Sequence, residues 1–261
     1  MRKNTYLEFG NNYELQFRMA LIKELGFDGI FIWQDEDSNR TIEVVKAARE
    51  HGLDVETMHL RFEGCNHLWL DDEDGRNYVD TVIMGIFQAA SLQIPTVIMH
   101  TIAKDTHPEV NELGLERIRL ILNVCESYHV NLAIENIREL KYIDRVFTSL
   151  QSPFLKMCFD SGHTNCFAYR LNDVSFDQYA PYLHCVHLHD NLGDYDGHLI
   201  PFQGKIDFKW IVHELKRIGF KGPLTSEAHI APNQVISDRD FLTQVMQALN
   251  KLETYFGDVD A

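Results

Sequence analysis

Short apolar runs alternate with longer amphipathic stretches along this chain, and the alternation repeats eight times. Apolar runs of about five residues are typical of buried strands, and stretches with an apolar residue every three or four positions are typical of helices. The predicted strands are Thr5–Phe9, Gly29–Trp33, Asp54–His59, Thr96–His100, Leu132–Glu135, Leu155–Asp160, Cys185–His189 and Leu224–Glu227. The helices predicted between them include Thr41–His51, Asn77–Ser91, Leu113–His129, Phe208–Ile218 and Asp240–Tyr255.

Strands that alternate with helices form a parallel sheet, and eight such units close on themselves as a barrel. We therefore predict an α/β fold, a single-domain (β/α)₈ TIM barrel over residues 1–261, with an open doubly wound sheet as the alternative. No Pro-, Ser- or Gly-rich tract marks a domain boundary. No run of about 20 apolar residues is present either, so we expect neither a membrane span nor a signal peptide.

Strand parity tests this register, because side chains alternate between the two faces of a strand. If the polar residues that end the last six strands face the barrel interior, so do the residues two positions earlier: Thr57, Ile98, Ala133, Cys158, Cys185 and Thr225. These residues are mostly small, as a narrow barrel interior requires. The intervening residues are bulky and suit contact with the helices: Met58, Met99, Ile134, Phe159 and Val186.

Each of the last six predicted strands ends in a residue that can ligate a metal ion: His59, His100, Glu135, Asp160, His187 and Glu227. The carboxyl ends of the strands form the active site in barrel enzymes. Further candidate ligands lie just beyond these ends: His163, His189, Asp196 and His198. Imidazoles mixed with carboxylates, without clustered thiolates, suit zinc, manganese, cobalt or iron.

Each of these residues also has an ordinary structural explanation when it is taken alone. A histidine at a strand end is usually a hydrogen-bonded structural residue, and Asp160 with His163 can simply shape a turn or cap a helix. Together, however, they would gather polar groups in one partly buried mouth, at a cost on the order of several kcal/mol unless they are paired or hold a cation. The set as a whole therefore predicts a divalent-metal site. Trp33, Phe62 and Trp69 can line a substrate pocket beside it or serve as ordinary packing.

Charge and cysteine content narrow the class of protein. The formal net charge of −15 opposes a polyanionic partner, so nucleic acid is not expected. Five cysteines, an odd number without a CxxC pair, argue against a disulfide framework or a zinc knuckle and suit a reducing cytoplasm.

Several stretches, in this order and spacing, resemble the xylose isomerase-like barrels, a family that also includes endonuclease IV. They are Ala133-Ile134-Glu135-Asn136, Phe159-Asp160-Ser161-Gly162-His163, Val186-His187-Leu188-His189-Asp190-Asn191, Asp196-Gly197-His198, Pro201 to Phe208 and Ser226-Glu227. In the sugar-epimerase branch, one metal is held by residues that match Glu135, Asp160, His187 and Glu227. In the endonuclease branch, three zinc ions are held by residues with counterparts here at His59, His100, Glu135, Asp160, His163, His187, Asp196, His198 and Glu227.

Two stretches depart from the family pattern. The family's Pro-Gly-x-Gly loop reads Pro201-Phe202-Gln203-Gly204 here, which leaves the conformation of that loop open. The His-Pro-Gly signature of the endonuclease is missing, because His100 is followed by Thr101 and Ile102.

The first functional hypothesis is a divalent-metal-dependent isomerase or epimerase of a sugar or keto-polyol, with a dehydratase acting through the same enediolate as a close variant. Glu135 and Glu227 would act as acid and base, and His163 would hydrogen-bond a substrate oxygen. The residues expected at the substrate are Trp33, His59, His100, His189 and His198. The expected cofactor is one zinc, manganese or cobalt ion, and the sequence also allows up to three metal ions. It also allows a homo-oligomer.

Two alternatives remain at this point. The full set of counterparts suits a zinc phosphodiester hydrolase acting on abasic DNA, whereas the net acidity and the few basic residues in the loops after strands two, three and seven oppose it. A metal-binding barrel without catalysis is the other alternative, and two carboxylates beside a metal argue against it. No Gly-rich phosphate loop follows strands seven or eight, which favours an unphosphorylated substrate.

Overall fold

All of the predicted strands are present in the computed structural model, which describes residues 1–10, 14–167 and 169–257. Within these residues the strands are β1 (Lys3–Tyr6), β2 (Gly29–Trp33), β3 (Asp54–His59), β4 (Thr96–Met99), β5 (Asn131–Glu135), β6 (Leu155–Asp160), β7 (Leu183–His187) and β8 (Leu224–Ser226). They form one parallel sheet in the order β7-β6-β5-β4-β3-β2-β1-β8. A parallel bridge between Leu188 and Ser226 joins β7 to β8 and closes the barrel. The predicted (β/α)₈ fold is confirmed, and the open-sheet alternative is wrong.

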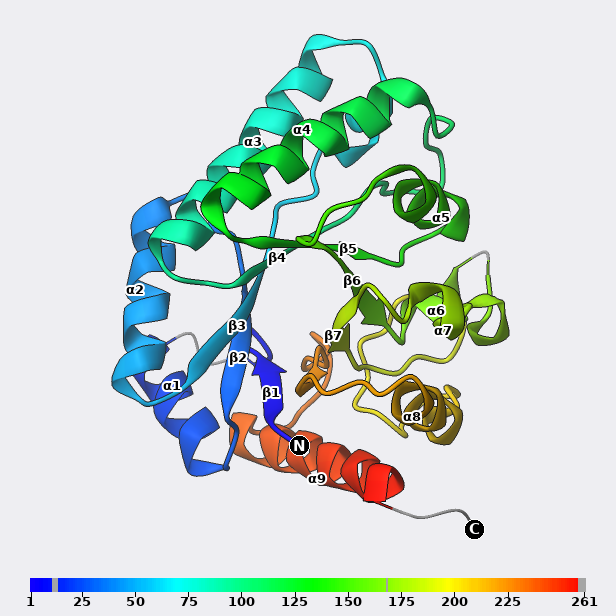
Figure 1. Ribbon diagram of the computed structural model, residues 1–261. Coiled ribbons are helices and arrows are strands. Elements are labelled where there is room, and N and C mark those ends of the chain that lie inside the picture. Colours follow the sequence, from blue (N-terminus) through cyan, green and yellow to red (C-terminus); the bar gives the residue numbers. More distant parts are fainter. Residues whose placement is uncertain (11–13, 168, 258–261) are drawn as a thin grey trace.

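The helices surround the strands, as Figure 1 shows. The α-helices are α1 (Leu15–Glu24), α2 (Ser38–Glu50), α3 (Glu73–Ser91), α4 (Glu112–Tyr128), α5 (Leu140–Ser149), α6 (His163–Cys166), α7 (Phe176–Tyr179), α8 (Phe208–Arg217) and α9 (Asp238–Gly257). Two short 3₁₀ segments, η1 (Cys65–Trp69) and η2 (Leu171–Asp173), lie in the connections. No described helix is long and apolar enough to span a membrane.

Short polar side chains determine where several of the helices begin. Asp37, Asp72, Asn111 and Asp207 precede α2, α3, α4 and α8, and each accepts a hydrogen bond from a backbone N–H two or three residues further on. Such capping satisfies N–H groups that have no partner inside the helix.

The barrel wall separates two apolar cores, as strand parity predicts. Ile98, Ala133, Cys158 and Cys185 form a small buried cluster inside the barrel. The bulky residues at the intervening positions belong to the large core between strands and helices: Met58, Met99, Ile134, Phe159 and Val186. The division is confirmed at these positions, and it places the residues that end β5, β6 and β7 on the interior face.

Two predicted strands are displaced along the chain. The first runs over Lys3–Tyr6 rather than Thr5–Phe9, because β1 pairs in register with β2 and β8 through these earlier residues. Leu7 and Phe9 are buried beyond the strand, which explains why the apolar alternation continues past its end. The seventh runs over Leu183–His187 rather than Cys185–His189, so His189 lies after the strand.

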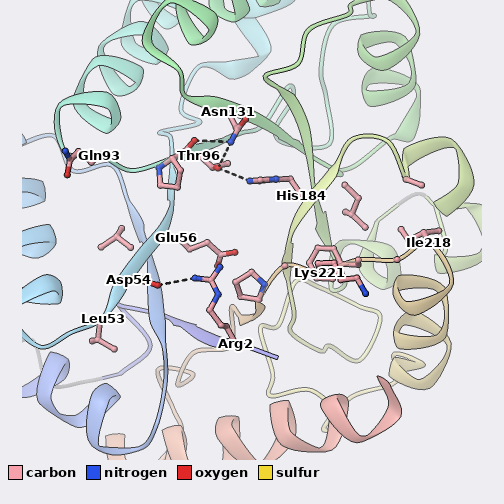
Figure 2. A pocket seen from close by; sticks show the side chains of 18 of the residues that line it. Arg2, Leu53, Asp54, Glu56, Gln93, Thr96, Asn131, His184, Ile218 and Lys221 are labelled. Carbon is pink, nitrogen blue, oxygen red and sulfur yellow. Dashed lines mark hydrogen bonds and ion pairs between the residues drawn. The ribbon is translucent and has the colours of Figure 1, made fainter. Parts of the chain in front are cut away.

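The two ends of the barrel carry different cavities, and the one at the amino ends of the strands is shown in Figure 2. It measures about 740 Å³ and is lined by Arg2, Asp54, Glu56, Thr96, Asn131 and His184 among others. Glu56 and His184 enter it from irregular positions, because the register shifts by one residue in β3 between Val55 and Thr57 and in β7 between Leu183 and Cys185. Bulges of this kind redirect a side chain out of the regular alternation.

Candidate metal centre

The residues that end the last six predicted strands meet at the opposite mouth of the barrel. His59, Glu135, Asp160 and His187 are the last residues of β3, β5, β6 and β7, and His100 and Glu227 directly follow β4 and β8. All six side chains are buried. The register of β6 and β7 places Asp160 directly beside His187. The register of β5 and β6 places Glu135 beside Cys158, which lies two residues before Asp160. The closed barrel therefore brings to one centre residues that are far apart in the sequence.

Four of these residues form a tight group at the floor of the mouth. One ligand atom each of Glu135, Asp160, His187 and Glu227 lies within 4.8 Å of the others. The Nδ1 atom of His187 is 2.7 Å from Oε1 of Glu135 and 3.3 Å from Oε2 of Glu227. Three carboxylates and one imidazole form a hard, mostly oxygen donor set that suits a divalent cation such as zinc or manganese.

The orientation of His187 supports this fit. Both ring nitrogens of His187 are buried and have no hydrogen-bond partner, although carboxylate oxygens lie near Nδ1. The ring stacks on Phe31, with the centroids 4.4 Å apart. A buried polar atom without a partner is costly, and a cation held between these side chains would relieve that cost. The residues present therefore fit a divalent metal ion.

His59 and His100 lie on one side of this group. The Nδ1–H of His59 donates to the carbonyl oxygen of Leu60 at 2.8 Å, and its Nε2 lies 3.3 Å from Oε2 of Glu135. Nε2 of His100 contacts the same carboxylate oxygen, and Nδ1 of His100 is buried without a partner. These three residues form a second group whose atoms are close enough to share an ion.

His163, His189, Asp196 and His198 lie on the other side. Nε2 of His189 is 3.0 Å from Oδ2 of Asp160, and its ring stacks on that of His198 with centroids 4.0 Å apart. Oδ2 of Asp196 lies 3.3 Å from Nε2 of both His163 and His198. On this side two groups could hold an ion, Asp160 with His163 and His189, and His189 with Asp196 and His198. A further group, at the floor, is Glu135 with Cys158 and His187.

Backbone carbonyls orient three of these imidazoles in the same way. The Nδ1–H of His59 donates to the carbonyl oxygen of Leu60, that of His163 to the carbonyl oxygen of Asn136, and that of His198 to the carbonyl oxygen of Glu227. Each Nε2 is then directed at the site, which is the orientation that ligating histidines usually have.

Charge within the mouth shifts the pKa of most of its groups. Burial alone would raise the pKa values of Glu135 and Glu227, but the positive charge of His187 outweighs it and holds both well below the usual range. Burial raises the pKa of Asp160. Burial would lower the pKa of His163 and His187, yet the neighbouring carboxylates raise both well above the usual value, and the pKa of His198 rises to about 9. Burial lowers the pKa of His100 to about 4. The raised pKa values thus favour protons on His163, His187 and His198, which balance part of the negative charge of the carboxylates.

A cavity of about 760 Å³ opens above this floor. Its lining includes Glu135, Glu227 and all the histidines proposed for the site except His187 and His189. Trp33 lies in its wall, stacked on His59 with the centroids 3.9 Å apart, and Phe62 lies beside it. Trp69 does not reach the cavity. It is buried in the core, where its Nε1–H donates to the carbonyl oxygen of Thr101.

The residues that hold the ligands in place were not among those predicted from the sequence. Asn136 accepts a hydrogen bond from the backbone N–H of Asp160 and donates to its carbonyl oxygen, and the hydroxyl of Tyr169 donates to the carbonyl oxygen of Asn136. Gly162 lies so close to His189 that a Cβ atom there would be 1.9 Å from the ring. The sequence signal for Asn136 was its position directly after Glu135, whereas Tyr169 and Phe31 carry no such signal.

The loop that departs from the family pattern keeps a glycine-like turn. Phe202 has a φ of 77°, in the left-handed region that favours glycine. Its ring packs 5.2 Å from that of Phe208, and Nζ of Lys251 lies 3.7 Å above it. Asp190 holds the end of the loop by accepting hydrogen bonds from the backbone N–H groups of Gly204 and Ile206. Packing of Phe202 therefore compensates for a backbone conformation that a glycine adopts without strain.

Comparison with known proteins gives several relatives. An uncharacterised protein, y4fM of Sinorhizobium fredii (strain NBRC 101917 / NGR234), is 28% identical over 178 residues, which cover 63% of this chain and 57% of that protein. The match thus spans a little over half the length of this relative. A crystal structure of a D-tagatose 3-epimerase-like protein superposes with a TM-score of 0.77 at 20% identity, over 98% of this chain and 97% of that one. The IOLI protein with a bound zinc atom superposes with a TM-score of 0.79 at 14% identity, over 97% of this chain and 99% of that one.

At these identities the structural likeness concerns the fold. The family assignment rests on the sequence itself, because residues 19–245 match the family described as xylose isomerase-like TIM barrel. This match includes every residue of the centre described above. The chain therefore belongs to the xylose isomerase-like TIM barrel family.

Proposed function

We propose that this protein is a divalent-metal-dependent isomerase or epimerase that acts on a sugar or a sugar-like keto-polyol. The observation that carries the proposal is the convergence of Glu135, Asp160, His187 and Glu227 at the floor of a cavity large enough for a small molecule. Family membership and the likeness to a D-tagatose 3-epimerase-like protein support the same class of reaction.

The same four residues would hold the metal ion. When bound, a divalent cation polarises a carbonyl oxygen and the neighbouring hydroxyl oxygen of a substrate and so makes the proton on the adjacent carbon more acidic. Zinc, manganese or cobalt would suit these ligands. His59 and His100 on one side, and His163, Asp196 and His198 on the other, would contact the substrate or hold further ions. His189, expected from the sequence at the substrate, does not line the cavity and would instead hold Asp160 or a further ion.

Glu135 and Glu227 would transfer the proton. Both carboxyl groups have lowered pKa values, so they are ionised at neutral pH and can accept a proton from carbon. They belong to different parts of the barrel wall, at β5 and after β8, and both line the cavity. One carboxylate would remove the proton, and the other would return a proton to the opposite face of the enediolate.

His163 would donate a hydrogen bond to a substrate oxygen. Its raised pKa keeps the ring protonated, its Nδ1–H is engaged by the carbonyl oxygen of Asn136, and its Nε2 lies in the cavity wall beside Asp196. Trp33 and Phe62 would shield the apolar side of a sugar from water. A dehydratase would use the same residues, because it loses a hydroxyl group from the same enediolate.

One structural observation favours a second candidate, a zinc phosphodiester hydrolase. The groups around His59 and around His189 each bring together enough ligand atoms for an additional ion, and clustered metals can activate water and bind a phosphate. Among the described residues of the cavity, however, Lys104 and Arg138 are the only lysine and arginine, which is few for a surface that grips a nucleic acid.

Metal content and solvent exchange test the proposal together. Elemental analysis of the purified protein should give about one exchangeable divalent metal per chain. The metal-loaded protein, incubated in deuterated water with a panel of ketoses and inososes, should exchange hydrogen at the carbon beside the carbonyl. About three zinc ions per chain, no exchange with any sugar and nicking of abasic DNA would overturn the proposal in favour of the hydrolase.

A further inference from the structure

The two basic side chains of the active-site cavity stand on backbone that most residues avoid. Among the described residues that line the cavity, Lys104 and Arg138 are its lysine and arginine, and their φ angles are 64° and 55°. Left-handed backbone is uncommon for residues with a side chain, and it persists only where the surrounding structure enforces it. Such positions concentrate at functional sites, so the observed backbone directs attention to these two cations.

Arg138 occupies the centre of a tight turn directly after the strand that carries Glu135. The backbone N–H of Glu139 donates to the carbonyl oxygen of Ile137 at 2.6 Å, which makes a three-residue turn around Arg138. Buried Ile137 and Asn136 anchor one side of this turn, and α5 begins on the other side at Leu140. The turn therefore places the arginine at the rim of the cavity whose floor contains Glu135.

The guanidinium group of Arg138 is only partly used within the protein. It lies over the ring of Phe167, 4.5 Å from the centroid, and Nη1 pairs with Asp105. The Asp105 side chain is 96% exposed, so this pair contributes little. Nε is buried and has no hydrogen-bond partner. Nη2 makes no hydrogen bond within the described residues, so an oxyanion at the rim would replace the exposed Asp105 carboxylate and accept hydrogen bonds from Nη1 and Nη2 of this aromatic-stacked arginine.

Lys104 adds a second positive charge from the neighbouring loop, after β4. The other charged side chains of the cavity, apart from histidines, are carboxylates: Glu63, Asp105, Glu135, Asp194, Asp196 and Glu227. A neutral sugar would have no need of two cations in this setting. A substrate with its carbonyl end at the floor and an anionic end at the rim would match both ends of the cavity.

We propose that the substrate is an acidic sugar, in which the end distant from the reacting carbonyl carries a carboxylate or a phosphate bound by Arg138 with Lys104. The inference rests on the proposed function and adds the substrate class. Carboxylate and phosphate share the chemistry that Arg138 recognises. The absence of a Gly-rich phosphate loop after β7 and β8 makes the carboxylate the expected form.

The experiment compares three ligands on one carbon skeleton: a ketohexose, the keto acid with a carboxylate at carbon 6, and the 6-phosphate. Calorimetry on the manganese-loaded protein measures binding, and solvent deuterium exchange measures turnover. The keto acid should bind wild-type protein tightest. Arg138→Met should weaken its binding about 10–100-fold, the size of a lost charge-assisted hydrogen-bond pair, and should leave binding of the neutral ketohexose unchanged.

Two further variants separate binding from folding. Arg138→Gly suits a φ of 55° and should unfold no earlier than wild type, yet it should lose the same affinity for the keto acid. Arg145→Met is the matched control, because Arg145 also pairs with an exposed carboxylate, Glu112, but lies on α5 outside the residues that line the cavity. It should bind all three ligands as wild type does.

The outcomes distinguish this inference from the function it rests on. Equal binding of the three ligands, or equal losses in Arg138→Met and Arg145→Met, would refute the anion site while exchange with the neutral sugar still supported an isomerase. Binding of the keto acid that depends on Arg138, without exchange in any ligand, would support the anion site and refute the isomerase. Preference for the 6-phosphate would support the anion site and identify its ligand as a phosphate.

Discussion

The two ends of the barrel each hold a polar cavity of similar volume, about 760 Å³ at the carboxyl ends of the strands and about 740 Å³ at the amino ends. Both contain carboxylate and imidazole side chains. They differ in how the polar groups are satisfied. At the amino ends, neighbours pair with one another: Arg2 with Asp54, and Asn131 with Thr96, which in turn contacts His184 (Figure 2). Glu56 accepts hydrogen bonds from Asn4 and Thr225.

At the carboxyl ends, the groups contact one another, as His100 does Glu135 and His189 does Asp160, yet several buried atoms keep no hydrogen-bond partner. His187 and His189 retain buried ring nitrogens without a hydrogen-bond partner, as does His100 at Nδ1, and Oδ1 of Asp196 also lacks one. The carboxylates of Glu135, Asp160 and Glu227 lie within one group of ligand atoms. Convergence of buried, unpaired donor atoms, rather than the size of the cavity, therefore distinguishes a candidate reactive centre from a polar end of a barrel. The physical reason is that hydrogen bonds between paired groups offset their loss of hydration. Buried atoms that converge without a partner need a bound ligand to offset that loss.

The largest expected difference between the two ends is in turnover. Glu227→Gln and Glu135→Gln should each lower the exchange rate about 10²–10⁴-fold, because an amide keeps the shape of the carboxylate but cannot accept a proton from carbon at neutral pH. Glu56→Gln, the corresponding change at the amino ends, should leave the rate unchanged. Metal content must be measured in each variant, since both active-site residues are also proposed ligands. Full activity in metal-loaded Glu227→Gln would exclude it as a base.

Removal of the metal should lower the stability of the protein through the site at the carboxyl ends and not through the cavity at the amino ends. A metal present at about 100 times its dissociation constant stabilises the folded state by about 2.7 kcal/mol. For a domain of this size, chelation should then lower the Tm by roughly 5–10 °C. The Asp54→Asn variant, which lacks the exposed ion pair with Arg2, should show the same drop in Tm on chelation as the wild-type protein. An unchanged Tm after complete removal of metal, checked by elemental analysis, would contradict a metal at the carboxyl ends.

Close packing around the candidate ligands gives a smaller effect. Gly162→Ala places a methyl group against the ring of His189 and should destabilise the fold by about 1–3 kcal/mol, because the ring must move away from Asp160. It should also weaken metal binding. Gly222→Ala, in the lining of the other cavity, would contact Phe220 and should leave metal affinity unchanged. Denaturant unfolding and metal titration measure the two effects, and equal metal affinity in wild type and Gly162→Ala would show that His189 does not support the centre.

The smallest expected effect concerns Glu56. Burial raises its pKa above the usual value, so the folded state disfavours its charged form at neutral pH. A raised carboxyl pKa contributes stability below the unfolded pKa, and this contribution is lost as the pH rises through the folded pKa. Glu56→Gln should therefore be slightly more stable than wild type at pH 7 and as stable as wild type below the usual carboxyl range. A stability difference that grows as the pH falls would have the wrong sign.

Much of the fold followed from the sequence because it depends on local periodicity. The alternation of strands and helices, the small residues at Ala133 and Cys158 and the bulky ones at Ile134 and Phe159 all reflect the two-residue repeat of a strand. The two one-residue register shifts could not be foreseen, because an extra residue such as Glu56 leaves no mark in the apolar pattern. The displaced ends of β1 and β7 have a similar cause, since pairing with neighbours, not hydropathy, ends a strand.

The candidate residues of the centre could be predicted from their positions in the chain, because any parallel barrel brings the carboxyl ends of its strands to one mouth. Glu135, Asp160, His187 and Glu227 were four of the six candidates found on that basis, and the family resemblance singled them out as one metal's ligands. Three features could not be predicted in this way: the convergence of the ligand atoms, the backbone carbonyls that hold His59 and His163, and the left-handed backbone at Arg138 and Phe202. These features depend on side-chain torsions and on packing between segments far apart in the chain. Local sequence does not encode them, because the energies that select them arise only after the barrel has closed.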